Sequence, residues 1–398
     1  MKKVFVFLVL IGIIFITGCG KNNAESVLKD LTNKINKLNG YTLKGVLDVK
    51  NNNNSYTYDV SVSFMQKDKY KVELVNQANN HEQVILRNDD GVFVLTPSLN
   101  KSFKFQSDWP YNNSQVYILS SIIDDLNRDD KIKEEEKDEN YIYTSKVNYP
   151  NNKKLTTQKV TVSKDMFIEK VEVLNDEGNV EMSFVINNID YNPTFSESYF
   201  EVNSIINTNI KEEDNISKKE DNAEDNKTTD TTCDSEKDQN CQKKDNQTTK
   251  QQSNINNNYI VKPITMTMNG QDKEEKNDTK NVASLDDIVY PLYLPTGTVL
   301  KEQEKVSKTD GERVILTFAG DKGFTLVEET AVKEKEFTII PTYGEPGFVN
   351  DTIGAITDNS LNWISNGLEY YMVSDVMNTV ELLDIANSIN VTSVASLK

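Results

Sequence analysis

Residues 55–64 read Ser-Tyr-Thr-Tyr-Asp-Val-Ser-Val-Ser-Phe, so that aromatic or aliphatic residues alternate with polar ones along the whole stretch. Side chains on a β-strand point to opposite faces in turn, so this period of two predicts a strand with one buried face. The tripeptide Asp89-Asp90-Gly91 adds a hairpin signal, because glycine tolerates positive φ. The alternation recurs upstream and downstream, and we expect further strands at 41–49, 70–74, 140–147, 157–163, 167–174 and 180–187.

Two stretches of the same region have a helical period instead. Residues 24–38 place Val27, Leu31 and Ile35 on one stripe, and Asn22 with Glu25 could form a capping box at the start of that helix. Residues 114–127 form the second predicted helix. Two helices cannot cover so many strands. We therefore expect an α+β domain over 24–205, built as a large, curved antiparallel sheet that stays an unclosed barrel.

The C-terminal region predicts a second, smaller α+β domain over 284–391. Asp310-Gly311 and Asn366-Gly367 are hairpin signals between alternating stretches. Residues 379–389 have a helical stripe, and Asn378 with Glu381 can form a capping box before it. Phe337 to Ile340 reads as a strand of this domain.

The N-terminus has the pattern of an exported lipoprotein. Lys2 and Lys3 precede an apolar run to Ile16 that is too short to span a bilayer comfortably. Ile16, Thr17 and Gly18 then lead into Cys19, in the order of a bacterial lipobox. We expect residues 1–18 to be a signal peptide, Cys19 to carry diacylglycerol, and 19–23 to tether the protein to the extracytoplasmic face of the cell membrane. The alternative is an ordinary secretory signal or a single-pass anchor.

Between the two predicted domains lies a polar, acidic linker over 206–283, with a short apolar island at 259–268. It has too few apolar residues to offset the entropy of ordering, so we expect a disordered spacer, with a dedicated binding tail as the alternative. Cys233 and Cys241 within it could form a disulfide or stay free thiols. The net charge is −18, and −20 once Lys2 and Lys3 leave with residues 1–18, which disfavours nucleic acid as a partner.

The sequence offers no catalytic constellation. His81 is the single histidine, and a general base needs partners that the sequence does not place near it. No metal-ligand spacing and no phosphate-binding glycine loop occurs, so we expect no metal, no cofactor and no enzymatic activity. Trp109 and Trp363 are interpreted as packing residues.

Residues 24–205 resemble the LolA-type lipoprotein-carrier fold in their order of elements, including the helix that follows Trp109-Pro110. Residues 284–390 resemble the C-terminal domain of sporulation and germination lipoproteins of spore-forming bacteria. Three stretches carry that second resemblance, namely Tyr-Pro-Leu-Tyr-Leu-Pro-Thr-Gly-Thr at 290–298, Gly-Glu-Arg-Val-Ile-Leu-Thr-Phe at 311–318 and Gly-Ala-Ile-Thr-Asp-Asn-Ser-Leu-Asn-Trp at 354–363. The acidic insertion at 207–258 departs from that family.

These resemblances imply an apolar hollow for acyl chains, and in a related member a peptidoglycan amidase as partner. One hypothesis is a lipid-binding module, and the other is a scaffold that docks and regulates a cell-wall enzyme; a hydrolase remains only as a third. The lipid hypothesis follows from a sheet face larger than two helices would fill, unless side chains fill the hollow completely. The expected cavity residues are Tyr58, Val60, Val62, Phe64, Val72 and Leu74 on the sheet, covered by Leu119, Ile122 and Ile123.

Overall fold

The computed structural model describes residues 23–51, 54–206, 260–261, 285, 288–308 and 311–389. The predicted signal peptide, the lipobox and Cys19 lie outside these residues, as do Cys233, Cys241 and almost all of the predicted linker. Within the described ranges, no helix is both long and apolar enough to cross a membrane.

The larger sheet contains 13 of the described strands. Their bounds are β1 (Gly40–Asn51), β2 (Asn54–Met65), β3 (Lys69–Asn76), β4 (Glu82–Asn88), β5 (Gly91–Thr96), β6 (Lys101–Phe105), β7 (Lys133–Lys137), β8 (Asn140–Lys146), β9 (Leu155–Ser163), β10 (Ile168–Asn175), β11 (Val180–Asp190), β12 (Ile260–Val261) and β16 (Thr338–Thr342). The strand order is β12-β16-β6-β5-β4-β3-β2-β1-β11-β10-β9-β8-β7. Neighbours pair antiparallel except around β16, which is parallel to both β12 and β6. The apolar island of the linker thus contributes β12 to the sheet edge.

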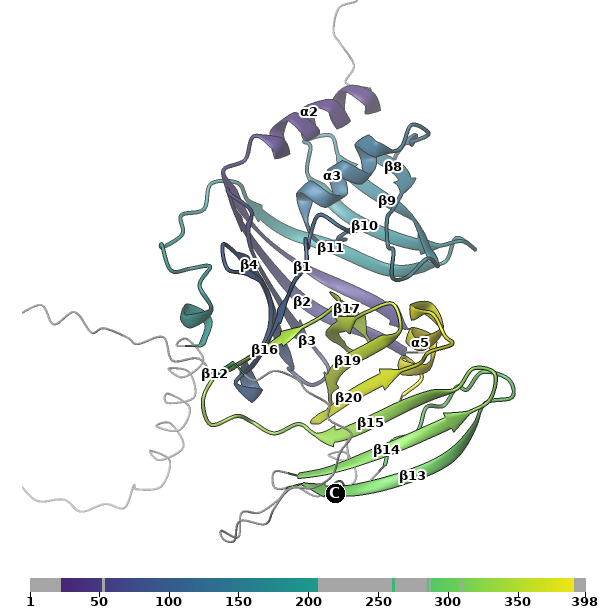
Figure 1. Cartoon of the computed structure of the whole chain (residues 1–398). Helices are drawn as coiled ribbons and strands as arrows, with labels where there is room; N and C mark the ends of the chain where they lie inside the picture. Colours follow the sequence, from purple (N-terminus) through teal and green to yellow (C-terminus); the bar gives the residue numbers. More distant parts are fainter. Residues whose placement is uncertain are drawn as a thin grey trace, which may run out of the picture.

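The alternation seen in the sequence sets the register of this sheet. Leu47 on β1 lies opposite Tyr58 on β2, and Val62 on β2 lies opposite Val72 on β3. All four side chains are buried in one core. Figure 1 shows the strands around β1 and β11 curving beneath two helices, α2 (Ala24–Asn36) and α3 (Leu119–Arg128). The predicted class is confirmed: an α+β fold with a large, unclosed, mainly antiparallel sheet and few helices.

The two helices differ in detail from the sequence prediction. Asn23, not Asn22, is the N-cap of α2, and its side chain accepts a hydrogen bond from the Ser26 N–H at 2.8 Å. The second helix begins at Leu119 rather than at 114. The residues before Leu119 do not continue the helix. The Ser114 N–H donates to the Asn148 carbonyl at 2.8 Å, and this bond holds the segment against the β8–β9 loop.

The smaller sheet follows in the C-terminal part of the chain. Its strands are β13 (Val299–Lys308), β14 (Gly311–Ala319), β15 (Phe324–Thr330), β17 (Glu345–Val349), β18 (Thr352–Ile356), β19 (Ser360–Ser365) and β20 (Leu368–Val373). The order is β13-β14-β15-β20-β19-β18-β17, and helix α5 (Thr379–Ala386) contacts β19 and β20. Asn366 and Gly367 both have positive φ in the β19–β20 hairpin, and Asn378 with Glu381 forms the capping box. Both sequence predictions are confirmed.

We call the larger sheet with α2 and α3 the N-terminal unit, and the smaller sheet with α5 the C-terminal unit. The chain between β15 and β17 leaves the C-terminal unit, adds β16 to the N-terminal unit beside β6, and returns. Gly344 makes the return turn at φ 92°, where a Cβ would lie 2.3 Å from the Ile356 carbonyl oxygen. The strand predicted at 337–340 is confirmed, but it pairs with the larger sheet of the N-terminal unit and not with the sheet of the C-terminal unit.

Candidate functional site at the junction of the two units

The predicted cavity residues lie together on the concave side of the larger sheet. Eight of the nine are buried, and Phe64 is half-buried against the same core. Leu119, Ile122 and Ile123 of α3 and Val27 and Leu31 of α2 belong to this core as well. Side chains therefore fill the hollow at this end, and an acyl ligand among these nine residues stays a prediction.

The rest of the concave face is covered by the C-terminal unit. The β17–β18 hairpin reaches it, and the ring centroid of Phe348 lies 5.6 Å from that of Tyr58. Ile353 and Ala355 of β18 are buried in the same core cluster as the N-terminal sheet. The two units thus share one hydrophobic core at their junction.

Asn350, at the tip of this hairpin, ties both units together. It has φ 57°, a left-handed conformation that asparagine tolerates. Tyr56 donates its hydroxyl to Asn350 Oδ1 at 2.6 Å, and the Asn51 amide donates to the Asn350 carbonyl. On the other side, Asn350 Nδ2 donates to the Ile389 carbonyl at 2.6 Å, and the Asn350 N–H donates to Asn387 Oδ1 at 2.8 Å.

Gln83 on β4 makes a second polar contact with the hairpin. Its Nε2 donates to the Ile353 carbonyl at 3.0 Å, and its Oε1 accepts from the Ile353 N–H at 2.6 Å and from Thr352 Oγ1 at 2.7 Å. The Gln83 side chain is buried, so these bonds replace those it would make with water. Lys154 Nζ pairs with Asp384 Oδ1 at 2.6 Å, and Lys101 Nζ with Glu369 Oε2 at 3.1 Å, at the rim of the junction.

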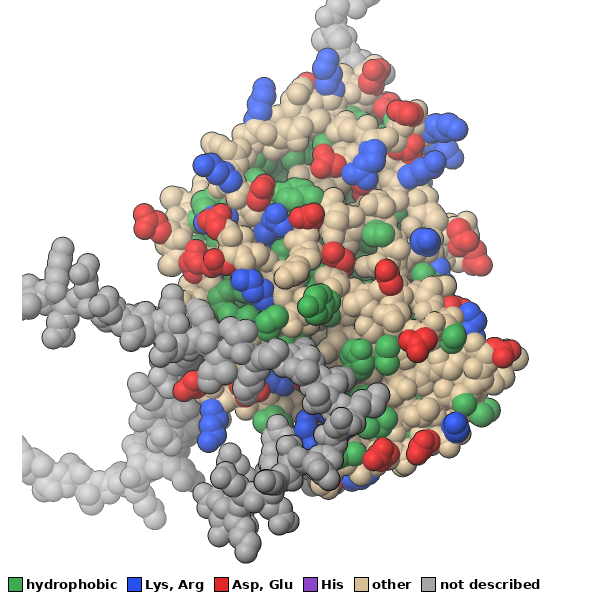
Figure 2. All heavy atoms as spheres, in the orientation of Figure 1, with side chains coloured by type: hydrophobic (Ala, Val, Ile, Leu, Met, Phe, Trp, Pro, Cys, Tyr) green, Lys and Arg blue, Asp and Glu red, His purple; other side chains and the backbone are tan. Residues whose placement is uncertain are grey.

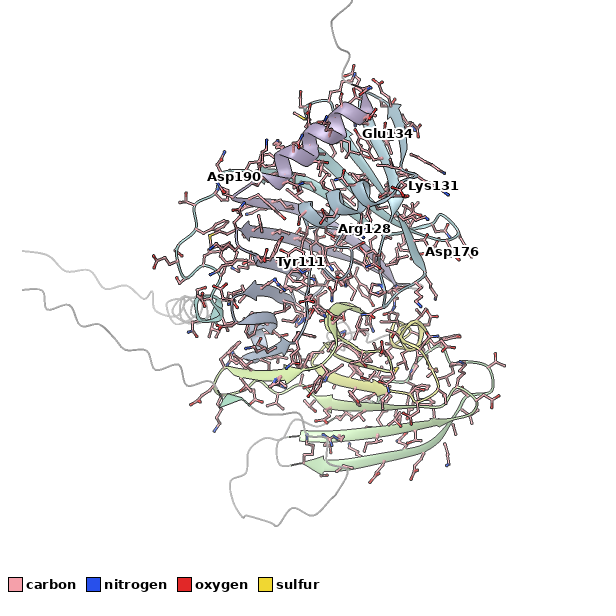
Figure 3. The ribbon with its side chains drawn as sticks, turned by 45° about the horizontal axis from the view of Figure 1, so that its top comes forward. Tyr111, Arg128, Lys131, Glu134, Asp176 and Asp190 are labelled. Carbon is pink, nitrogen blue, oxygen red and sulfur yellow. The ribbon has the colours of Figure 1, made fainter. Side chains whose placement is uncertain are left out.

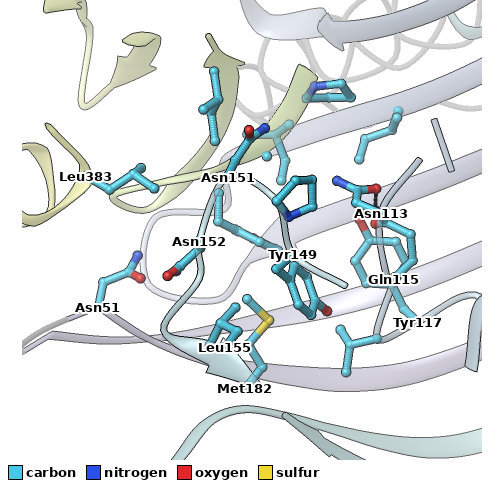
Figure 4. Close-up of a pocket in the computed structure, with 18 of the residues that line it drawn as sticks. Asn51, Asn113, Gln115, Tyr117, Tyr149, Asn151, Asn152, Leu155, Met182 and Leu383 are labelled. Atoms are coloured by element: carbon cyan, nitrogen blue, oxygen red, sulfur yellow. Dashed lines mark hydrogen bonds between the residues drawn. The ribbon is translucent and has the colours of Figure 1, made fainter. Parts of the chain in front are cut away.

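A pocket of about 90 Å³ remains between the units (Figure 4). Its apolar lining comes from both units and includes Ile85, Val116, Tyr117, Leu155, Met182, Phe348 and Ile353. Carboxamides form much of the polar lining, namely Asn51, Asn113, Gln115, Asn151, Asn152 and Asn387. Gln115 Nε2 donates to Asn113 Oδ1 at 2.5 Å. The pocket is amphipathic, and it is smaller than the roughly 300–1,000 Å³ of typical ligand sites.

None of the nine predicted residues lines this pocket, and sequence reasoning missed the residues that do. The lining residues come from segments far apart in the sequence, such as Asn51, the 149–152 turn and Phe348. The only local signal was Tyr149-Pro150-Asn151-Asn152, a turn sequence after a strand, since binding residues often lie on loops.

Titratable groups gather where the hairpin meets the N-terminal unit. Burial lowers the pKa of His81, while the negative charge of Asp351 raises it. Burial raises the pKa of Asp351, against the opposing effects of a Ser365 hydrogen bond and the positive charge of His81. His81 Nε2 and Asp351 Oδ1 are buried without a hydrogen-bond partner among the described residues, as are the hydroxyls of Tyr58 and Tyr370.

One carboxyl group is buried inside the C-terminal unit. Glu328 on β15 is fully buried, and burial raises its pKa to about 7, although the Val289 N–H donates to its Oε2 at 3.1 Å and opposes the shift. Its neighbour across the strands is Tyr370, which stacks on Trp363 with ring centroids 4.8 Å apart. No group of three or more histidine, cysteine, aspartate or glutamate side chains within the described part of the chain could hold a metal ion.

A second, open depression lies beside the C-terminal end of α3. Its lining includes Tyr111, Arg128 and Lys131, which Figure 3 labels, together with Asp125 and Asp129. Arg128 Nη1 contacts Asp125 Oδ1 at 3.0 Å, and burial raises the pKa of Asp125 to about 6. The mixed charges favour no single ligand charge. Figure 2 likewise shows acidic and basic side chains interspersed over the face in view.

The protein belongs to the YdcC-like sporulation protein family. The model of that family matches residues 1–200. The chain is 30% identical over 391 residues to sporulation protein YdcC of Bacillus subtilis (strain 168), covering 98% of this chain and 97% of that one. The resemblance to a sporulation family seen in the sequence is therefore confirmed.

The solved structures that the chain resembles include the following two. A LolA superfamily protein from Nitrosomonas europaea is 10% identical, covers 46% of this chain and 98% of its own, and gives a TM-score of 0.28. The complex of the CwlD amidase with the GerS lipoprotein from Clostridioides difficile is matched at 20% identity over 44% of this chain and 95% of that chain, with a TM-score of 0.24.

Proposed function

We propose that this protein is a lipoprotein, fixed through Cys19 to the outer face of the cell membrane, that binds an acyl chain without catalysing a reaction. One observation carries the acyl-binding part. The apolar concave face of the larger sheet extends beyond α2 and α3, and the remainder is covered by a hairpin of the other unit, with the pocket between them. An apolar face that is covered by a separate unit suits an apolar ligand, because both exclude water from it.

The pocket lining fits one end of a fatty acyl group. Tyr117, Leu155 and Met182 offer apolar contact, and each buried methylene of a ligand contributes about 0.8 kcal/mol. The carboxamides at the rim can donate to and accept from an ester or carboxylate end of the lipid. Such a lining has donors and acceptors, but it lacks a paired nucleophile and base, which supports a binding role rather than catalysis.

The test is mass spectrometry of lipids that remain on the protein after native extraction from sporulating cells. Met182→Trp should fill the pocket, and Ile189→Trp on the same strand is the matched control because Ile189 lies outside the pocket lining. We expect an acyl lipid at about one per chain on the wild type and the control, and several-fold less on Met182→Trp. A wild type free of lipid would rule the function out.

A second candidate is a scaffold that docks a cell-wall enzyme, favoured by exposed apolar side chains on the C-terminal unit. Leu292 is 76% exposed and Tyr293 is 49% exposed, and the backbone N–H groups of both donate to Ser388, which follows helix α5. Exposed apolar clusters often mark protein contacts. Leu292→Glu should abolish co-purification of a peptidoglycan enzyme, whereas Val376→Glu, at another exposed site of the same unit, should not. Absence of any enriched wall enzyme with the wild type would exclude this role.

A further inference from the structure

The β17–β18 hairpin occupies the part of the concave face into which an acyl chain would extend. Phe348 lines the pocket and also contacts Tyr58, so its ring separates the 90 Å³ pocket from the apolar residues of β2. Tyr58 is buried, and it lies on the sheet face that continues through Val60 and Val62 under the helices.

We propose that this hairpin is a built-in plug, which closes the acyl site and competes with the ligand for the same apolar face. This inference rests on the acyl-binding function proposed above. It adds that the C-terminal unit controls access, and that Phe348 is the residue that blocks the way.

The size of the pocket requires such a movement. A volume of about 90 Å³ is well below the roughly 300–1,000 Å³ of sites that enclose a drug-sized ligand. The surrounding interior is packed, with Ile353 and Ala355 buried against the N-terminal sheet. Because packed interiors do not stretch continuously, a long acyl chain enters only if the hairpin withdraws.

The interactions that hold the hairpin are suited to release. Gln83 of β4 and Tyr56 of β2 bind the hairpin at Ile353 and Asn350 through hydrogen bonds between neutral groups, and water can replace each of these bonds once the hairpin moves. The ligand would then pack on the apolar sheet face that Ile353 covers in the closed state, so that this face stays shielded from water. Meanwhile β16 can keep the unit attached, since its five residues pair with β6 outside the hairpin, and Gly344 lies between the two.

A plug of this kind has a defined effect on affinity. If only a fraction of the molecules is open, the apparent dissociation constant equals the intrinsic one divided by that fraction. Any substitution that weakens the plug without removing an apolar side chain of the sheet face therefore tightens ligand binding. A substitution that damages the C-terminal unit elsewhere leaves the binding unchanged.

Three variants separate these cases. Phe348→Ala removes the blocking ring, and Gln83→Ala removes hydrogen bonds to the hairpin from a position outside the pocket lining. Phe318→Ala is the matched control, a phenylalanine buried in the separate core of the C-terminal unit. The second plug variant covers the case in which Phe348→Ala folds poorly.

The measurement is binding of cis-parinaric acid, a fluorescent long-chain fatty acid, to the full mature chain from residue 19 carrying Cys19→Ser so that it takes no lipid. We expect Phe348→Ala and Gln83→Ala to lower the dissociation constant by about tenfold or more, and Phe318→Ala to match the wild type. In the wild type, saturation with the probe should also increase hydrogen exchange at the Ile353 amide, which Gln83 protects in the closed state.

The two possible failures are distinct. If the wild type and all variants bind the probe with the same affinity, and exchange at Ile353 does not change, the plug is refuted while acyl binding stands. If no variant binds the probe at any concentration below its solubility limit, acyl binding itself is refuted and the plug with it.

Discussion

The side chain of Gln83 and the backbone of Ile353 are joined in both directions across the junction of the two units. The Gln83 Nε2 donates to the Ile353 carbonyl at 3.0 Å, and the Gln83 Oε1 accepts from the Ile353 N–H at 2.6 Å. A side-chain amide thus pairs with β18 as another strand would. One residue of the N-terminal unit satisfies both backbone groups of a buried residue in the C-terminal unit.

Gln83→Ala should therefore destabilise the protein. It leaves the Ile353 amide, its carbonyl and the Thr352 hydroxyl without these partners, and each unsatisfied buried group costs about 1–3 kcal/mol. We expect a loss of at least about 1 kcal/mol in the free energy of unfolding, measured by urea denaturation. Gln77→Ala is the control, because Gln77 is exposed, and it should change stability by less than about 0.5 kcal/mol. Equal effects of both substitutions would contradict the prediction.

Glu328 should make the stability of the C-terminal unit depend on pH. Its pKa in the folded state is about 7, above its ordinary value of 4.5, so the folded state favours the protonated carboxyl group. The stability that this preference contributes is full below about pH 4.5 and is lost as pH rises through 7. Glu328→Gln, which cannot ionise, should gain on the order of 2–3 kcal/mol over the wild type near pH 8, and much less near pH 4.5.

The measurement is denaturant unfolding of both proteins across this range, with Glu304→Gln on the exposed strand β13 as control. The control should follow the wild type at every pH. A constant difference between Glu328→Gln and the wild type would show that Glu328 does not titrate in this window.

His81 should make the stability of the protein depend on pH in the opposite direction to Glu328. Burial lowers its pKa below the ordinary value of 6.5, so the neutral imidazole contributes stability that is present above that value and is lost as pH falls. His81→Gln stays neutral, and its stability relative to the wild type should rise between about pH 7 and about pH 5. Unfolding curves at these two values test this. Asn80→Gln, in the same turn, should show no such change, and parallel curves for His81→Gln and the wild type would refute the effect.

Cys19 should determine whether the protein is attached to the membrane. Cys19→Ser removes the thiol that carries diacylglycerol, and two acyl chains are what makes such an anchor stable. We expect the wild type in the membrane fraction, labelled by radioactive palmitate, and the variant without label. The matched control is Cys233→Ser, which should leave both label and fractionation unchanged. Incorporation of palmitate into Cys19→Ser would place the lipid elsewhere.

Much of this fold was predictable because hairpin turns, helix caps and strand faces depend on residues that are close together in the sequence. Asn366-Gly367 forms its hairpin with positive φ at both residues, and Asn378 with Glu381 caps α5 by reciprocal hydrogen bonds within four residues. The alternation over 55–64 settled which face of β2 is buried, because a shift by one residue would expose every apolar side chain. These features need no knowledge of the remainder of the chain.

Contacts between distant segments escaped prediction. The run Lys133–Lys137 has no alternating apolar pattern, yet it forms the exposed edge strand β7, where charge protects a sheet edge from further pairing. The pocket lining was missed for a similar reason. Phe348 and Met182 have no periodic relationship in sequence, and only the docking of the hairpin brings them together. The identity of β16 as a strand was predictable from 337–340, whereas its parallel partner β6 was not.

The crossing of β16 also fixes the order in which the molecule can be completed. Strand β6 pairs with β5 as soon as both are made, but its other edge stays open until the chain has been made as far as Thr342. An open strand edge readily pairs with other chains. A nascent or truncated product that ends before β16 therefore carries an unprotected template for aggregation. The free edge of β6 is covered only when residues 338–342 pair with it, late in the synthesis of the chain.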